Sequence, residues 1–207
     1  MAQYFEMHPD NPQPRLIQQA VKIIQQGGVI VYPTDSCFAL GCAIGEKSAL
    51  DRIRQLRRLG DKHNFTLACR DLSEIGTYAR VENAAYRLLK AHTPGPFTFV
   101  LKATGEVPRR LQHPKRRTIG IRVPEHPVAA ALLAALGEPL MTTTLLMPDQ
   151  DIPWTEPADI VDGIGSQVDL VIAAGPCDVE PSTVIDLHGE LPVVLRQGKG
   201  DASAFAE

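Results

Sequence analysis

The chain has 207 residues, of which 44% are hydrophobic and 22% are charged, and its formal net charge is −3. This composition is typical of a globular protein and excludes a low-complexity chain. No apolar run approaches the roughly 20 residues that a membrane-spanning helix needs, and the small negative charge argues against bulk attraction to nucleic acid.

The first half of the chain alternates between helical and extended patterns. Pro14 suits the first turn of a helix that we predict over 14–26, and Gly27 and Gly28 end it. A strand follows over 29–32. The remaining predictions for this half are a helix over 46–58, a strand over 65–69, a helical turn over 71–74 with a capping-box pattern, and a helix over 82–92 that ends at Thr93.

The second half predicts more strands than helices. We expect strands over 97–102, 118–122 and 140–146, an alanine-rich helix over 126–136 and a shorter helix over 158–164. A loop rich in proline and aspartate spans 147–157 and holds Trp154. Strands over 168–173, 183–187 and 193–196 complete the chain. Alternating elements followed by consecutive strands predict an α/β fold with a mixed sheet, in one domain over 1–207.

The first residues of the chain argue against export, and its cysteines argue against a metal site. Residues 1–8 have neither the charged start nor the apolar core of an export signal, so we expect a cytoplasmic protein. The four cysteines lack paired spacing and neighbouring histidines, which predicts reduced thiols and no metal bound by protein ligands; they are Cys37, Cys42, Cys69 and Cys177.

Small polar residues follow the strand predicted over 29–32. Thr34, Asp35 and Ser36 come after Tyr32 and Pro33, and α/β sheets usually bind ligands at such strand ends. An ordinary turn, in which Thr34 satisfies local backbone groups, is the alternative.

Basic residues concentrate in two runs. One lies in and after the helix predicted over 46–58; the other contains Arg109, Arg110, Lys115, Arg116 and Arg117 and no acid. The runs predict a cationic face suited to phosphate or RNA, whereas solvated surfaces are the plain alternative.

Seven short segments rich in hydroxyl-bearing and cationic residues lie at the ends of predicted elements. In order they are 33–36, 57–58, 94–98, 118–124, 142–144, 182–186 and 195–198. Their order, spacing and content resemble the YrdC-like family of threonylcarbamoyl-AMP synthases, over about 14–198. The segments 63–67 and 8–12 are most similar to the YciO branch of that family.

The resemblance implies a twisted mixed-sheet domain with one large, positively charged cleft. There, family members convert L-threonine, bicarbonate and ATP to threonylcarbamoyl-AMP and pyrophosphate, with Mg²⁺ accompanying the nucleotide; the product feeds tRNA threonylcarbamoyladenosine modification. Such a reaction depends on positioning and on cations that stabilise charge on oxygen. The resemblance also implies possible binding of tRNA or double-stranded RNA, for which the second basic run would serve.

Carried onto this sequence, the family pattern assigns ten residues to the cleft. Arg57, Arg122 and Thr34 would act in catalysis. The substrate and nucleotide would be bound by Tyr32, Thr34, Arg57, Arg58, Thr118, Arg122, Thr142, Thr144, Ser182 and Arg196. Plainer roles compete: strand-end arginines also pair with surface acids, and threonines favour strands. His63 is either a proton carrier or a structural histidine.

Two departures from the synthase pattern leave three functions open. Gln55 stands where the synthases have the lysine of a Lys-x-Arg pair, and Leu146 stands where they have the asparagine of Ser-x-Asn. A missing ammonium costs roughly 1.5–3 kcal/mol of contact with a triphosphate, and leucine offers no hydrogen bond. The chain is therefore a threonylcarbamoyl-AMP synthase, a hydrolase of that or a related adenylate, or a non-catalytic protein that binds nucleotides or RNA.

Overall fold

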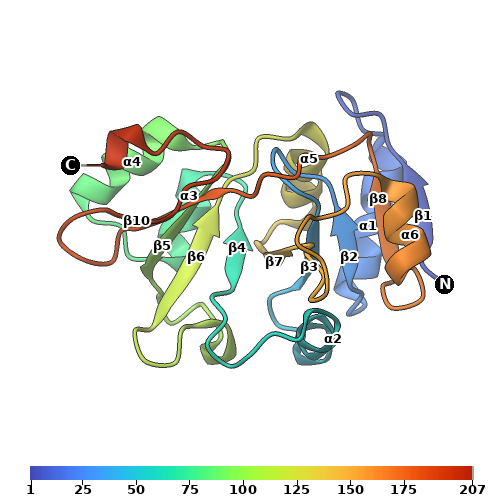
Figure 1. Cartoon of the computed structure of the whole chain (residues 1–207), viewed down its shortest axis with the longest axis horizontal. Helices are drawn as coiled ribbons and strands as arrows, with labels where there is room; N and C mark the ends of the chain where they lie inside the picture. Colours follow the sequence, from blue (N-terminus) through green and yellow to red (C-terminus); the bar gives the residue numbers. More distant parts are fainter. Residues whose placement is uncertain (207) are drawn as a thin grey trace.

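Ten strands of the protein form one mixed sheet. The computed structural model describes residues 1–206 (Figure 1). From one edge to the other, the strands are β1 (Gln3–Glu6), β8 (Leu170–Ala173), β2 (Ile30–Tyr32), β3 (Ala39–Ala43), β7 (Leu140–Thr144), β4 (Thr66–Ala68), β6 (Thr118–Arg122), β5 (Phe97–Lys102), β9 (Thr183–Asp186) and β10 (Val193–Arg196). Four neighbouring pairs are parallel, namely β1/β8, β8/β2, β4/β6 and β5/β9, and the others are antiparallel. The predicted mixed-sheet α/β fold is confirmed.

The helices begin and end where the sequence supplies caps and breakers. They are α1 (Pro14–Gln25), α2 (Lys47–Arg57), α3 (Leu72–Tyr78), α4 (Asn83–His92), α5 (Pro127–Leu136) and α6 (Pro157–Ile164), with short 3₁₀ turns at Arg109–Leu111 and Ser203–Phe205. Proline opens α1, α5 and α6, and Asp71 caps α3 by accepting a hydrogen bond from the Glu74 backbone N–H. No helix within residues 1–206 is long and apolar enough to cross a membrane.

Apolar side chains cover both faces of the sheet. In and beside β2, Ile30 and Tyr32 belong to a core shared with α1 and α5, whereas Val29 and Val31 belong to a core shared with α2, α3, α4 and α6. Figure 1 shows α1 and α5 together on one side of the sheet. Two buried faces explain why the strands read as continuous apolar runs.

Four elements differ from the sequence expectations. β3 lies in a segment that we expected only to be apolar, and β1 lies in a segment for which we predicted no strand. β7 ends at Thr144, two residues earlier than predicted, because the Leu146 backbone N–H turns back to donate to the Thr144 carbonyl at 3.0 Å. α3 continues to Tyr78, beyond the single turn predicted over 71–74.

A row of small residues crosses the face that carries α1 and α5. The register aligns Gly41 with Thr142, Thr142 with Thr66, Thr66 with Gly120, and Gly120 with Val100. Paired residues point to the same face, so this part of the sheet presents hydroxyls and glycines instead of large apolar groups. The row leaves space for a cleft.

Candidate functional site

Four residues of this row, Thr142, Thr66, Gly120 and Val100, form the floor of a cavity of about 320 Å³, here called the cleft. Eighteen residues line it: Cys37, Ala39, Arg57, His63, Asn64, Thr66, Thr98, Val100, Gly120, Arg122, Thr142, Thr143, Thr144, Leu146, Pro181, Ser182, Val184 and Arg196. Within residues 1–206, the lining holds three arginines and no carboxylate. A ligand with negative charge is favoured by such a wall.

Tyr32 supports the floor from below. Its ring is fully buried, and its hydroxyl lies 2.7 Å from the Thr142 hydroxyl, which in turn donates to the Leu40 carbonyl. Gly41 makes this approach possible, since a Cβ there would lie 3.1 Å from the Tyr32 ring and 2.6 Å from Leu140. Burial raises the pKa of Tyr32 to about 12, so the hydroxyl keeps its proton.

Arg57, the last residue of α2, reaches the cleft wall through two fixed contacts. Its Nε donates to the Leu146 carbonyl and its NH1 donates to the Thr143 hydroxyl, both at 2.8 Å. His63 Nε2 lies 3.3 Å from the same hydroxyl. Burial, followed by the charges of Arg57 and Arg54, lowers the pKa of His63 to about 4, and the imidazole is therefore neutral at pH 7.

Arg122, at the end of β6, forms a buried ion pair with Asp35. Its NH2 contacts the Asp35 carboxylate, its NH1 donates to the Ser36 hydroxyl at 3.3 Å, and only 7% of the residue is exposed. Its Nε is buried and has no partner within residues 1–206. The other Asp35 oxygen accepts the Glu125 backbone N–H at 2.9 Å. Arg122 thus lines the cleft while its Nε–H is left without a hydrogen-bond partner.

Arg196, on edge strand β10, completes the cationic lining. Its Nε and NH2 donate to the Ser182 carbonyl at 3.1 and 2.8 Å, and the Ser182 hydroxyl lies 2.7 Å from that of Thr98. Burial lowers the pKa of Arg196, and the nearby charge of Arg122 acts in the same direction. An anion between the two guanidiniums would relieve their repulsion.

The loop between β2 and β3 carries Asp35 to Arg122. Within it, the Thr34 hydroxyl donates to the Cys37 carbonyl at 2.6 Å and accepts the Ser36 backbone N–H at 3.1 Å. Lys199 donates to the Asp35 carbonyl at 2.7 Å. Thr34 therefore braces the turn, and the role in catalysis assigned to it stays a prediction.

Six of the ten residues assigned to the cleft from sequence line it together: Arg57, Arg122, Thr142, Thr144, Ser182 and Arg196. Tyr32 and Thr34 are buried behind the lining, and Thr118 is buried at the start of β6. Arg58 points elsewhere: its side chain is 69% exposed and pairs with Asp149 at 3.1 Å.

The two departures from the synthase pattern fall in different places. Gln55 lines a surface hollow with Arg52 and Arg58 and does not line the cleft. The missing lysine therefore leaves no visible gap in the cleft lining. Leu146 does line the cleft, and there its side chain offers no hydrogen bond.

Asp35 is the site residue whose role sequence reasoning missed. It was noted only as part of a polar turn, and Arg122 lies 87 positions away along the chain. A carboxylate in a strand-end turn was the available signal, although nothing in the sequence identifies its partner. Thr66 and Gly120 lie in segments noted from the sequence, 63–67 and 118–124, but they were not assigned to the cleft, because only the strand register brings them to its floor.

The basic run lies apart from the cleft lining. Arg109, Arg110, Lys115, Arg116 and Arg117 are all exposed in the connection between β5 and β6. Arg110 donates to the Gly45 carbonyl at 2.7 Å, and Arg116 pairs with Asp186 at 3.5 Å. RNA binding by this run stays a prediction.

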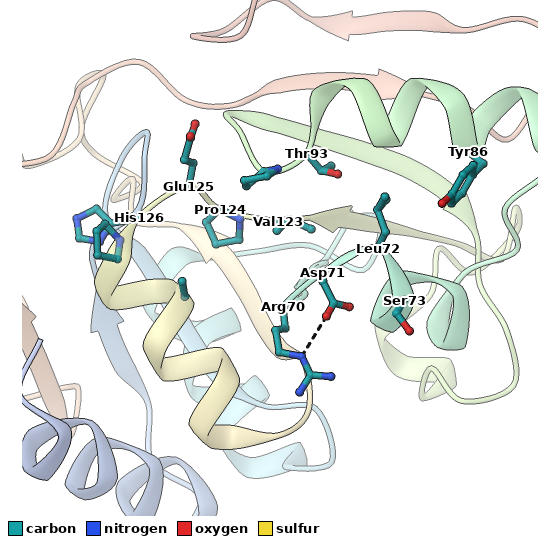
Figure 2. A pocket seen from close by; sticks show the side chains of 13 residues that line it. Arg70, Asp71, Leu72, Ser73, Tyr86, Thr93, Val123, Pro124, Glu125 and His126 are labelled. Atoms are coloured by element: carbon teal, nitrogen blue, oxygen red, sulfur yellow. Dashed lines mark hydrogen bonds and ion pairs between the residues drawn. The ribbon is translucent and has the colours of Figure 1, made fainter. Parts of the chain in front are cut away.

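A second and larger hollow, of about 790 Å³, lies among α3, α4 and α5 (Figure 2). Its wall is mainly apolar, with Leu72, Val123 and Pro124 among the lining residues, and Arg70 pairs with Asp71 at its rim. None of the site residues assigned from sequence lines it. The smaller, arginine-lined cleft is therefore the candidate site.

The fold and the cleft define an α/β protein that presents three arginines and several hydroxyls on one face of a mixed sheet. The family model for Sua5, YciO and YrdC proteins, described as "Telomere recombination", matches residues 22–198. The chain belongs to this family, which confirms the resemblance drawn from the sequence.

Known relatives place the chain near the YciO proteins. YciO of Escherichia coli strain K12 is 56% identical over 205 residues, covering 99% of this chain and 100% of that protein. The crystal structure of E. coli YciO matches with a TM-score of 0.97 over 100% of both chains, at 56% identity. A threonylcarbamoyl-AMP synthase of Nitrosococcus oceani is 34% identical over 170 residues, covering 79% of this chain and 91% of that protein.

A more distant structure shares the fold. P. abyssi Sua5, solved in complex with L-threonine, matches with a TM-score of 0.87 at 23% identity, over 95% of this chain and 58% of that one. That the family includes threonylcarbamoyl-AMP synthases is shown by the Nitrosococcus oceani relative.

Proposed function

We propose that the cleft binds an adenylate of the threonylcarbamoyl-AMP type and forms it from L-threonine, bicarbonate and ATP. The observation that carries the proposal is the buried Nε of Arg122, which has no partner within residues 1–206 and belongs to a lining with two further arginines. A buried donor without a partner is costly, and a carboxylate, carbamate or phosphate oxygen would accept its proton.

The proposed reaction builds negative charge where the arginines lie. The threonine amine attacks bicarbonate to give a carbamate and water, and a carbamate oxygen then attacks the α-phosphorus of ATP. The bond to pyrophosphate breaks and pyrophosphate leaves with its electron pair. Arg57, Arg122 and Arg196 would stabilise the carboxylate and phosphates, and Thr142, Thr144 and Ser182 would offer hydroxyls.

Magnesium would enter with the nucleotide. Among the described residues, those that line the cleft offer hydroxyls but no carboxylate. Mg²⁺ usually keeps several waters and binds substrate phosphates, and such hydroxyls can meet its hydration shell. The residues present therefore fit a metal carried by ATP better than one held by the protein.

Hydrolysis of the same adenylate is a second candidate, favoured by Leu146. Its side chain lines the cleft where an amide would otherwise meet the ligand. Hydrolysis needs only the adenylate and a water, whereas synthesis must also bind ATP and L-threonine, so a hydrolase tolerates the loss of a polar contact better than a synthase does.

The test is incubation of the purified protein with ATP, Mg²⁺, L-threonine and bicarbonate, followed by chromatography for threonylcarbamoyl-AMP. Product above a control without enzyme, lost in Arg57→Ala, is expected. In a parallel reaction, threonylcarbamoyl-AMP is supplied and its breakdown is followed against its spontaneous decay. Faster decay without synthesis would assign the hydrolase, and neither reaction from a folded protein would contradict both enzymatic candidates.

A further inference from the structure

The Thr143 hydroxyl connects a histidine to a cleft arginine. Its oxygen lies 2.8 Å from Arg57 NH1 and 3.3 Å from His63 Nε2, and all three residues line the cleft. Thr143 is buried, and His63 is partly buried against Phe65, with ring centroids 5.0 Å apart at an interplanar angle of 73°. The histidine is therefore held in place by packing as well as by the hydroxyl.

The inventory of donors sets the direction of the Arg57 hydrogen bond, and the tautomer of His63 sets that of the other. A guanidinium only donates, so the Thr143 oxygen must accept from Arg57. The hydroxyl proton remains to be donated. His63, whose pKa burial and the neighbouring Arg57 and Arg54 lower to about 4, is neutral at pH 7, and its Nε2 can accept that proton. Nδ1 then carries the ring proton.

Two anchors orient the Arg57 guanidinium. The Leu146 carbonyl accepts from Nε and the Thr143 hydroxyl accepts from NH1, whereas NH2 has no hydrogen-bond partner within residues 1–206. A planar guanidinium held at two donors presents its remaining donors in a fixed direction, and less entropy is lost when a ligand binds.

We propose that His63 is a positioning residue: by accepting the Thr143 proton it fixes the hydroxyl, and the hydroxyl in turn fixes the Arg57 guanidinium for an anionic ligand. The inference rests on the proposed function, in which Arg57 binds a carboxylate or phosphate. It assigns His63 no direct proton transfer with the substrate.

Three substitutions separate positioning from packing. His63→Phe keeps an aromatic ring against Phe65 but removes the acceptor, whereas His63→Gln keeps an acceptor that can reach the place of Nε2. Thr143→Val removes the hydroxyl at nearly constant shape. ATP binding is measured by calorimetry, with the melting temperature as a control for folding.

The expected changes in ATP binding follow from His63, Thr143 and Arg57 belonging to one hydrogen-bond network. His63→Phe should weaken ATP binding about tenfold, and His63→Gln should restore it to within about threefold of the unmodified protein. Combining His63→Phe with Thr143→Val should weaken binding no more than either change alone, because both remove the same link. A purely structural histidine would give additive effects and no rescue by glutamine.

A second readout needs no ligand. The Arg57 Nε–H, assigned in a ¹H–¹⁵N spectrum by its absence in Arg57→Lys, should exchange slowly with water and exchange faster in His63→Phe. If the unmodified protein binds no ATP, the proposed function fails, and the exchange rate still tests positioning. Unchanged exchange, or ATP binding unchanged in His63→Phe, would overturn the role of His63.

Discussion

At residue scale, the ion pair between Arg122 and Asp35 is important for stability because it is buried. Both side chains are about nine-tenths buried, and the Asp35 carboxylate also accepts the Glu125 backbone N–H. Removing one member of a buried pair leaves the other charge without compensation, which is far more costly than loss of an exposed pair.

We therefore expect Arg122→Met to lower the free energy of unfolding by about 3–5 kcal/mol, measured by urea denaturation. The matched control is Arg52→Met, because Arg52 pairs with Asp169 while both side chains are about 40% exposed. That change should cost at most about 1 kcal/mol. Equal losses of unfolding free energy in the two variants would contradict the claim that Arg122→Met leaves the buried Asp35 charge without compensation.

His63 gives stability a defined pH dependence. Burial and the charges of Arg57 and Arg54 lower its pKa from 6.5 to about 4 on folding, so the unfolded chain binds more protons between these values. Stability from this group is fully present above pH 6.5 and is lost as the pH falls toward 4. The slope from this group should stay below about 1.4 kcal/mol per pH unit, because one imidazole binds at most one proton.

The measurement is the difference in unfolding free energy between the unmodified protein and His63→Gln across that range. The unmodified protein should lose stability more steeply than the variant as the pH falls. Parallel curves would show that His63 does not titrate differently in the folded protein.

At element scale, the Tyr32 ring packs closely against β3, and this contact requires a glycine at position 41. Gly41 on β3 lets the Tyr32 ring pass toward Thr142, and a Cβ there would meet Leu140 at 2.6 Å as well as the ring. The glycine is required here by close approach, not by an unusual backbone angle.

Gly41→Ala should therefore destabilise the protein by about 1–3 kcal/mol through overpacking, and it should displace the Tyr32 hydroxyl from Thr142. Gly105→Ala is the control, because a Cβ at Gly105 would meet no atom within 4 Å. Thermal unfolding compares the two, and a control at least as destabilised as Gly41→Ala would refute the packing argument.

The sequence predicted elements best where proline, glycine or capping residues mark their ends. Pro14 and Gly27 marked the two ends of α1, which was predicted over 14–26 and spans Pro14–Gln25. β3 was missed because alanine, glycine and cysteine give it little strand preference of their own, and its pairing with β2 and β7 stabilises it instead. Tertiary contacts of this kind leave no local signal.

The same limit applies to the site. Strand-end arginines such as Arg122 and Arg196 could be assigned by their pattern, and both line the cleft. Arg57 and Arg58 could not be separated, since only the end of α2 determines that the first faces the cleft and the second faces solvent. Contacts between residues far apart in sequence, such as Arg122 with Asp35, required the fold.

At the scale of the whole molecule, the cleft and the basic run are separate surfaces. The sequence predicts salt-sensitive RNA binding by the run, and its members are exposed. Exchanging Lys115 and Arg116 for glutamine should weaken retention of double-stranded RNA and lower its salt slope by about 2, with ATP binding unchanged. RNA retention that is unaffected, or absent in the unmodified protein, would contradict an RNA-binding run.

The most direct test of the cleft as the adenylate site compares two arginines of one chain. ATP binding is measured by calorimetry for the unmodified protein, for Arg196→Gln in the cleft lining and for Arg58→Asn outside it. Arg196→Gln should weaken binding about tenfold or more, and Arg58→Asn should leave it unchanged. Equal loss in both variants, or loss only in Arg58→Asn, would place the nucleotide elsewhere and contradict the assignment of the cleft.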